Sequence, residues 1–247
     1  MSSKLKIAVI AGTSEATELI NLISDRFDVT AFTATSYGSS ILGGSSCRIS
    51  QGRLDEIGFA EVLPEFDAVA DMSHPFAEIV SDTVKKVCRE LDLPYFRGGR
   101  EKVFYDYDRI SYVDSKEEAA ELLKSSQGNI FLTTGVKTLK FYETELYPDI
   151  GRIWARVLDS EESRRTCADS AVNIIYSKLP VPEEETDRIM RENNIRILVT
   201  KDSGVRGGLP EKIETAGKYN AEVIIIRSPE NGISNTPEKI LEQLLKL

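Results

Sequence analysis

Residues 6–20, KIAVIAGTSEATELI, contain the change of pattern that predicts the fold. The first five residues form an apolar, β-branched run that is typical of a buried parallel strand. A turn with Gly12 follows, and an amphipathic helix is expected over 15–24. Such a unit places free backbone N–H groups and the positive end of a helix dipole at the carboxyl end of the strand. The stretch therefore predicts an α/β fold with a turn suited to an anion.

The same alternation of strands and helices continues along the chain. Further strands are expected at 29–33, 68–72, 129–132, 153–157, 172–175, 197–200 and 223–226. Helices are expected near 55–63, 77–91, 116–124, 137–145, 183–193, 211–219 and 236–246. Strands that are apolar on both faces and separated by helices indicate parallel sheets with both faces covered, which is the doubly wound α/β class.

One sheet with all these strands would be large for 247 residues, so two Rossmann-like domains with a cleft between them are expected. The alternation is interrupted over 96–112, where Gly98, Gly99 and a charged, aromatic stretch occur. The predicted division is an N-terminal domain over 1–104 and a C-terminal domain over 105–247.

Composition excludes several classes of protein. The chain has 31 Lys plus Arg against 40 Asp plus Glu, a net charge of −9, which argues against a nucleic-acid or anionic-membrane binder. The 3 cysteines form no CxxC pair and there is 1 histidine, so no protein-bound metal is expected. The same cysteine pattern predicts a reduced cytoplasmic protein. The sequence contains no apolar run of about 20 residues for a membrane span. Oligomeric state stays open, a homo-oligomer included.

Ligands of open α/β sheets bind at the carboxyl ends of strands, so polar residues there are the candidates. After the first strand, Gly12, Thr13 and Ser14 suit a phosphate, or Gly12 makes a tight turn while Thr13 or Ser14 caps the helix. The second strand is followed by hydroxyls, Ser36 among them, and no carboxylate. That pattern favours NADP over NAD, and a solvated loop is the alternative.

Two motifs follow the third strand and the next apolar segment. His74, in DMSHPFA at 71–77, is suited to bond a ligand or donate a proton, or is a turn histidine held by Asp71. Arg97 and Arg100, in YFRGGR at 95–100, are suited to bind carboxylates or phosphates in bidentate fashion, or are solvated surface residues.

The second half carries the strongest candidate, TKDSG at 200–204, which Arg206 follows. A turn has little structural need for so much polarity, so a ligand role is favoured for it. TTG at 133–135 is a second turn suited to an anion. Lys212 is a weaker candidate, with capping of a nearby carboxyl end as the alternative, and Arg156 in an apolar strand needs a partner.

Together these motifs resemble the precorrin-6A reductase family of corrin-ring (vitamin B12) biosynthesis, including its cobalt-precorrin-6A reductases. The strings that carry the resemblance are AGTSEA at 11–16, DMSHPFA at 71–77, YFRGGR at 95–100, TTG at 133–135, TKDSG at 200–204, GG at 207–208 and RSP at 227–229. They occur in this order over nearly the full chain.

The resemblance implies NADPH-dependent reduction of one carbon–carbon double bond of precorrin-6A, or of its cobalt complex, to the 6B form. The implied cofactor contacts, in an NADPH-binding N-terminal domain, are Gly12, Thr13, Ser14, Glu15, Ser36 and His74. The implied contacts to the tetrapyrrole carboxylates, shared by the C-terminal domain, are Arg97, Arg100, Thr134, Gly135, Lys201, Ser203, Gly204 and Arg206. The candidate catalytic residues are Lys201, Asp202, Tyr95 and His74, and water is an alternative proton source.

Two other functions stay open at this point. One is an NADP-dependent reductase of another substrate, and the other is a non-catalytic module that binds a nucleotide or a tetrapyrrole. The choice between a cobalt-loaded and a metal-free substrate is also open.

Overall fold

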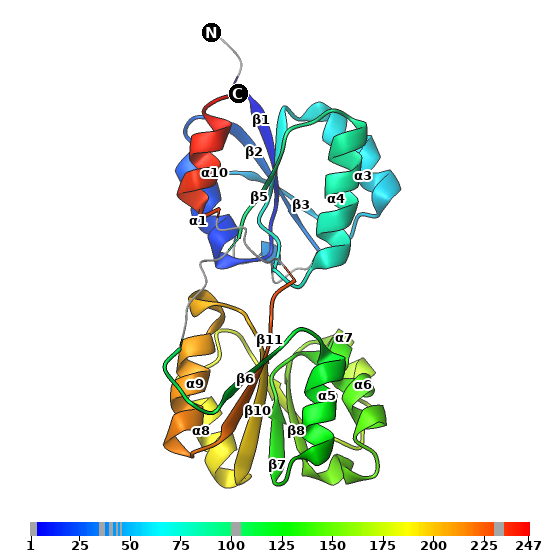
Figure 1. Cartoon of the computed structure of the whole chain (residues 1–247). Helices are drawn as coiled ribbons and strands as arrows, with labels where there is room; N and C mark the ends of the chain where they lie inside the picture. Colours follow the sequence, from blue (N-terminus) through cyan, green and yellow to red (C-terminus); the bar gives the residue numbers. More distant parts are fainter. Residues whose placement is uncertain are drawn as a thin grey trace. The chain divides into compact units, whose positions relative to one another are not determined.

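The computed structural model describes residues 4–34, 38, 39, 42, 44, 46–99, 105–229 and 235–247. The chain divides into two units (Figure 1). Unit 1 consists of Met1–Lys102 together with Pro229–Leu247, and unit 2 consists of Val103–Ser228.

The last segment of the chain belongs to unit 1, which corrects the expected C-terminal domain of 105–247. Helix α10 (Pro237–Leu244) packs beside helix α1 (Ser14–Ile23) in one hydrophobic cluster. Ile240 and Leu244 of α10 are buried there, so the apolar face of the last helix completes the core of the first unit.

The sheet of unit 1 is parallel throughout, in the order β3-β2-β1-β4-β5. Its strands are β1 (Lys6–Ile10), β2 (Asp28–Thr33), β3 (Arg48–Gln51), β4 (Ala68–Asp71) and β5 (Tyr95–Arg97). Helices α1 and α10 cover one face, while α3 (Glu56–Val62), the short η1 (Leu63–Glu65) and α4 (Glu78–Glu90) cover the other (Figure 1). The strand order reverses between β1 and β4, so their carboxyl ends form the predicted ligand-binding edge.

Unit 2 contains a second parallel sheet, in the order β6-β11-β10-β7-β8-β9. Its strands are β6 (Ile110–Val113), β7 (Asn129–Leu132), β8 (Ile153–Leu158), β9 (Asn173–Ser177), β10 (Ile195–Lys201) and β11 (Glu222–Ile226). Its helices are α5 (Lys116–Ser125), η2 (Val136–Thr138), α6 (Leu139–Glu145), η3 (Asp149–Arg152), α7 (Glu161–Thr166), α8 (Glu183–Glu192), η4 (Val205–Gly207) and α9 (Leu209–Lys218). Here the order reverses between β7 and β10.

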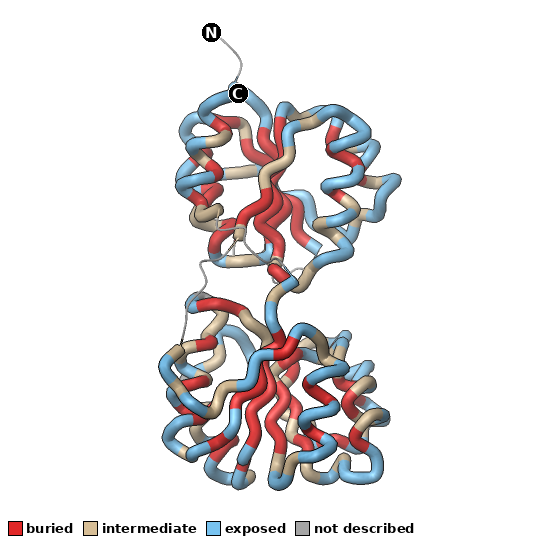
Figure 2. The backbone as a smooth tube through the Cα atoms, viewed as in Figure 1, coloured by how far each residue is buried: buried red, intermediate tan, exposed pale blue. Residues whose placement is uncertain are grey.

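Both sheets are buried at their centres, as Figure 2 shows by the buried strands inside a shell of more exposed helices. Residues 7–9 of β1 and 198–199 of β10 have no exposed surface. Burial of apolar side chains on both faces supplies about 25 cal/mol per Å2 of area removed from water, which is the main force that holds such a sheet together. The predicted class and two-unit architecture are confirmed.

Three strands were missed by the sequence pattern, and each lies at an edge of its sheet. All four residues of β3 are exposed, β5 has three residues, and β6 overlaps the end of the expected seam. Short edge strands bury little apolar surface, so they lack the hydrophobic run that marks a central strand. Among the described residues, no helix is both long and apolar enough to cross a membrane.

Candidate functional site

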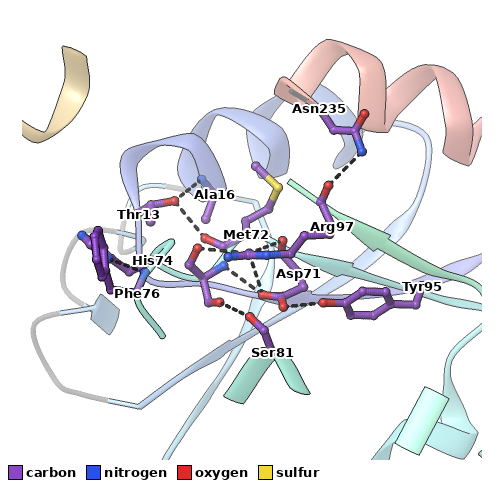
Figure 3. A network of polar contacts seen from close by, with 11 residues as sticks. Thr13, Ala16, Asp71, Met72, His74, Phe76, Ser81, Tyr95, Arg97 and Asn235 are labelled. Carbon is purple, nitrogen blue, oxygen red and sulfur yellow. Dashed lines mark hydrogen bonds and ion pairs between the residues drawn. The ribbon is translucent and has the colours of Figure 1, made fainter. Parts of the chain in front are cut away.

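Thr13 joins the two loops that follow β1 and β4. Its Oγ1 donates a hydrogen bond to the carbonyl oxygen of Met72 at 2.9 Å and accepts one from the backbone N–H of Ala16 at 3.2 Å (Figure 3). The second bond caps α1, which is the structural alternative considered for this residue. The same hydroxyl therefore starts the helix and fixes its N-terminus against the β4 loop.

Gly12 keeps the space beside this helix end open. A Cβ placed on Gly12 would meet only the backbone nitrogen of His74, at 4.0 Å. Gly12 and Ser14 are both exposed, so a ligand has access to the first turn of α1. The first N–H groups of a helix have no partner within the helix, and together with the helix dipole they suit a phosphate. The residues present thus fit the pyrophosphate of a dinucleotide.

The other two expected cofactor contacts in this region are Glu15 and Ser36. Glu15 is buried and accepts a hydrogen bond from the Ser14 hydroxyl at 3.0 Å, with its negative charge at the favourable end of the α1 dipole. Ser36 lies outside the residues that the structure describes.

A buried network supports the loop that carries His74. Asp71 is fully buried at the end of β4, and its Oδ1 lies 3.1 Å from Nη1 of Arg97 (Figure 3). The same nitrogen donates to the carbonyl oxygens of Asp71 at 2.8 Å and Ser73 at 3.1 Å. The backbone N–H of Ser73 donates to Asp71 Oδ1 at 3.0 Å. The side chains of Asp71 and Arg97 thus fix the path of residues 71–73.

This geometry does not fit the predicted role of Arg97 as a contact to substrate carboxylates. The side chain is buried, with 8% of its surface exposed, and Nη1 already has three acceptors. The reason is local, because β5 pairs with β4 and sets Arg97 beside Asp71. Arg100, its predicted companion, lies outside the described residues.

Tyr95 does not fit the predicted role of proton donor. Its hydroxyl donates to Asp71 Oδ2 at 2.7 Å. Burial, and then the negative charge of Asp71, raise the pKa of the Tyr95 phenol far above its usual value. A phenol that holds its proton this tightly is a poor acid, so Tyr95 belongs to the network that supports the loop.

His74 is not held by Asp71, whose carboxylate bonds Ser73, Tyr95 and Arg97 instead. The Nδ1 atom of His74 accepts a hydrogen bond from the backbone N–H of Phe76 at 3.2 Å. In the neutral ring this arrangement places the proton on Nε2. His74 is half-buried at the carboxyl edge, where an Nε2 proton suits a hydrogen bond to a ligand.

In unit 2, the TTG turn follows β7. The Thr134 hydroxyl is buried and bonded to that of Thr138 at 2.7 Å. Gly135 is exposed with φ 87°, a conformation that favours glycine, although a Cβ there would meet nothing within 4 Å. The backbone conformation at 135 therefore explains the glycine, and the exposed turn remains accessible.

The TKDSG segment turns sharply after β10. The backbone N–H of Asp202 donates to the carbonyl of Ile226 at 2.8 Å, and the buried Ser203 hydroxyl donates to the carbonyl of Gly207 at 3.0 Å. Gly204, with φ 63°, allows the reversal. Ser203 and Gly204 thus shape the turn, which presents Lys201 and Asp202 at the edge of the sheet. The side chain of Arg206 lies outside what the structure describes.

Lys201, the last residue of β10, is half-buried. Its pKa is lowered from the usual value of lysine, first by burial and then by the charges of Lys137 and Lys116. Sequence reasoning missed these two lysines. Lys137 follows the predicted strand at 129–132, whereas Lys116 follows β6, which the sequence pattern also missed.

Lys212, on α9, contacts the turn that contains Gly207. Its Nζ lies 3.3 Å from the carbonyl oxygen of Gly207 and 3.5 Å from Thr200 Oγ1. Burial, and then the charge of Arg156, lower its pKa to about 8. The partner that Arg156 requires is the Thr186 hydroxyl, at 2.8 Å from Nη1. Both cations thus have partners within the protein. For Lys212 this agrees with the alternative that it caps a nearby carboxyl end.

A cavity of about 660 Å3 lies in unit 1, lined in part by Lys4, Lys6 and Arg48. Lys6 and Arg48 begin β1 and β3, so this cavity is at the amino-terminal edge of the sheet. Gly12 and His74 are at the opposite edge, and the cavity is therefore separate from the candidate site.

Comparison with known proteins gives concordant matches. The family model described as precorrin-6x reductase CbiJ/CobK matches residues 6–245. The cobalt-precorrin-6A reductase of Priestia megaterium is 30% identical over 250 residues, which cover 97% of this chain and 98% of that protein. The cobalt-precorrin-6A reductase of Methanothermobacter thermautotrophicus is 33% identical over 238 residues, which cover 92% of this chain and 78% of that protein.

A solved structure shares the fold. The chain titled CobK precorrin-6A reductase superposes with a TM-score of 0.79 and 20% sequence identity, covering 98% of this chain and 96% of that one. At this identity the likeness supports the two-sheet α/β architecture.

Proposed function

This chain belongs to the precorrin-6x reductase family, and we propose that it reduces cobalt-precorrin-6A to the 6B form with NADPH as the hydride donor. The observation that carries the proposal is the family match over residues 6–245, which spans both strand-order reversals and the polar turns beside them. The curated relatives named above are reductases of the cobalt-loaded substrate, which favours that form over the metal-free one.

The edge at β1 and β4 is proposed to hold the nucleotide. Gly12 leaves room for the pyrophosphate, α1 offers its first N–H groups, and His74 is placed to donate from Nε2. No carboxylate occurs over residues 33–38, where an NAD site usually has one for the ribose 2′-hydroxyl, so a 2′-phosphate meets no repulsion from an acidic side chain there. NADPH, when bound, supplies the hydride.

The edge at β7 and β10 is proposed to contact the macrocycle. The substrate carries several acetate and propionate carboxylates, and the ammonium group of Lys201 supplies a complementary charge at the end of β10. A half-buried ammonium binds a carboxylate more strongly than an exposed one, because water screens the pair less.

Reduction of a carbon–carbon double bond adds a hydride to one carbon and a proton to its neighbour. Three of the four candidate residues remain as donors of this proton, and Tyr95 does not. His74 carries a proton on Nε2, and Lys201 holds its proton less tightly than an ordinary lysine. Asp202 is the next residue of the chain after Lys201. The protein's task is to position two ligands and one proton and to exclude water.

The test is to mix the purified protein with NADPH and cobalt-precorrin-6A and to follow nicotinamide absorbance. Loss of absorbance only when both ligands are present, with formation of the 6B product, supports the proposal. Binding of both ligands without oxidation would indicate a non-catalytic module. Faster oxidation with metal-free precorrin-6A would assign the other form of the substrate.

A further inference from the structure

We propose that Lys116 and Lys137 join Lys201 to form a three-lysine site that binds the carboxylates of the macrocyclic substrate. The inference rests on the proposed function and extends it, because it names two binding residues that neither the motifs nor the family match pointed to.

The three lysines come from chain segments that end at one edge of the sheet. Lys201 ends β10, Lys137 lies in η2 after β7, and Lys116 begins α5 after β6. Because β6, β11, β10 and β7 are consecutive parallel neighbours, their carboxyl ends lie side by side.

The register places Lys201 on the same side of the sheet as the other two lysines. Side chains alternate along a strand, so Lys201 points away from the face of Leu198, which packs in the cluster under α8 and α9. The opposite face is the one covered by α5 and α6 (Figure 1). Lys116 is the first residue of α5, and Lys137 lies in η2, directly before α6.

Among the residues that the structure describes, few counter-charges lie beside Lys116 and Lys137. Within the described part of the chain, the acidic partner of Lys116 is Glu117 at 3.8 Å, and both side chains are well exposed, so the pair is weak. The Nζ of Lys116 also lies 4.6 Å from the centre of the Phe141 ring. Among the residues that the structure describes, no carboxylate forms an ion pair with Lys137, which is exposed. The charges of Lys137 and Lys116 lower the pKa of Lys201, in accord with the neighbouring positions of the three chain segments at this edge of the sheet.

Neighbouring like charges repel one another, and a bound polyanion would reduce that repulsion. Acidic residues outnumber basic ones in the chain as a whole, so three neighbouring lysines depart from its average charge. A macrocycle with several separated carboxylates suits several separated ammonium groups. A pyrophosphate is better matched by the backbone N–H groups at α1.

The experiment compares Lys116→Gln, Lys137→Gln and the double variant with Lys140→Gln. Lys140 is a matched control because it lies three residues from Lys137, is 86% exposed, and pairs at 3.5 Å with Glu143. Binding of cobalt-precorrin-6A is measured by absorbance titration without a reductant, and binding of NADPH by fluorescence. The double variant is expected to bind the macrocycle roughly tenfold more weakly, with a smaller loss of affinity on adding salt, and NADPH as the wild type does.

The proposal is overturned if the double variant binds the macrocycle as tightly as Lys140→Gln, or if it loses NADPH affinity instead. Wild-type protein that binds the macrocycle without reducing it would refute the proposed function, while the titrations would still decide the role of the lysines. Wild-type protein that does not bind the macrocycle would refute both.

Discussion

Asp71 and Arg97 form an ion pair inside unit 1, with 3.1 Å between Oδ1 and Nη1 and with 0% and 8% of the side chains exposed. Asp71 ends β4 and Arg97 ends the neighbouring β5, so the pair spans two parallel strands at the edge where the nucleotide is proposed to bind. Neither charge is replaceable alone, because removal of one partner leaves the other buried without compensation.

Arg97→Met is therefore expected to lower the free energy of unfolding by about 3–5 kcal/mol. Lys86→Met, which breaks the exposed pair of Lys86 and Glu56, should change the free energy of unfolding far less. Urea unfolding of the two variants and the wild type provides the measurement. Similar losses in both variants would contradict a structural role for Arg97.

Thr13→Ala should cost about 1–2 kcal/mol of stability, because the hydroxyl caps α1. The same substitution removes the bond to the Met72 carbonyl and so frees the β4 loop. A rise in the KM for NADPH should accompany the loss of stability, and Thr13→Ser should restore both. If Thr13→Ser behaves like Thr13→Ala, the hydroxyl is not the group responsible.

Lys201→Ala should reduce kcat/KM for the macrocycle by roughly 10- to 100-fold, the loss of one hydrogen bond to a charged group. Thermal unfolding should change little, because burial disfavours the ammonium form in the free protein. The control is Lys218→Ala, which removes an exposed lysine of α9. A loss of stability as large as the loss of turnover would make Lys201 a structural residue.

NADPH should bind at least about tenfold more tightly than NADH. The physical reason is the hydroxyl-rich segment after β2, which carries no carboxylate to repel a 2′-phosphate. Fluorescence titration with both nucleotides decides the matter, and equal affinities would show the argument to be wrong.

Lys212 should make the stability of the protein rise with pH above about 8. Its pKa is lowered to about 8 in the folded chain from an ordinary value of 10.5. Between these values the unfolded chain binds the extra proton, so the free energy of unfolding increases with pH and this contribution levels off near 10.5.

Lys212→Met, which keeps an unbranched side chain but removes the ammonium group, should lose this rise. Denaturant unfolding of both proteins at several pH values over that window gives the comparison. Parallel pH profiles would show that Lys212 does not titrate in the window.

The sequence predicted what depends on strong local patterns. The central strands were located because runs such as IAVI at 7–10 are apolar on both faces, and the turns at 11–14 and 200–204 followed from them. The return of 229–247 to unit 1 was not predictable, because an amphipathic helix does not specify which core it completes.

Some positions in the candidate site could likewise be predicted from local sequence patterns, and others could not. The position of His74 at a strand end could be read from DMSHPFA. The burial of Arg97 against Asp71 depends on pairing between β4 and β5. A strand of three residues is too short for its sequence pattern to predict that pairing. Lys116 and Lys137 were missed because their proximity to Lys201 arises from the order of strands in the sheet.

The packing of α10 on α1 also bears on how the chain is made. Synthesis proceeds from the N-terminus, so all of unit 2 leaves the ribosome before Ile240 and Leu244 are available to the core of unit 1. The first unit to be started is thus the last to be completed. A chain that stops at residue 228 would contain every strand of both sheets and still lack part of one hydrophobic core.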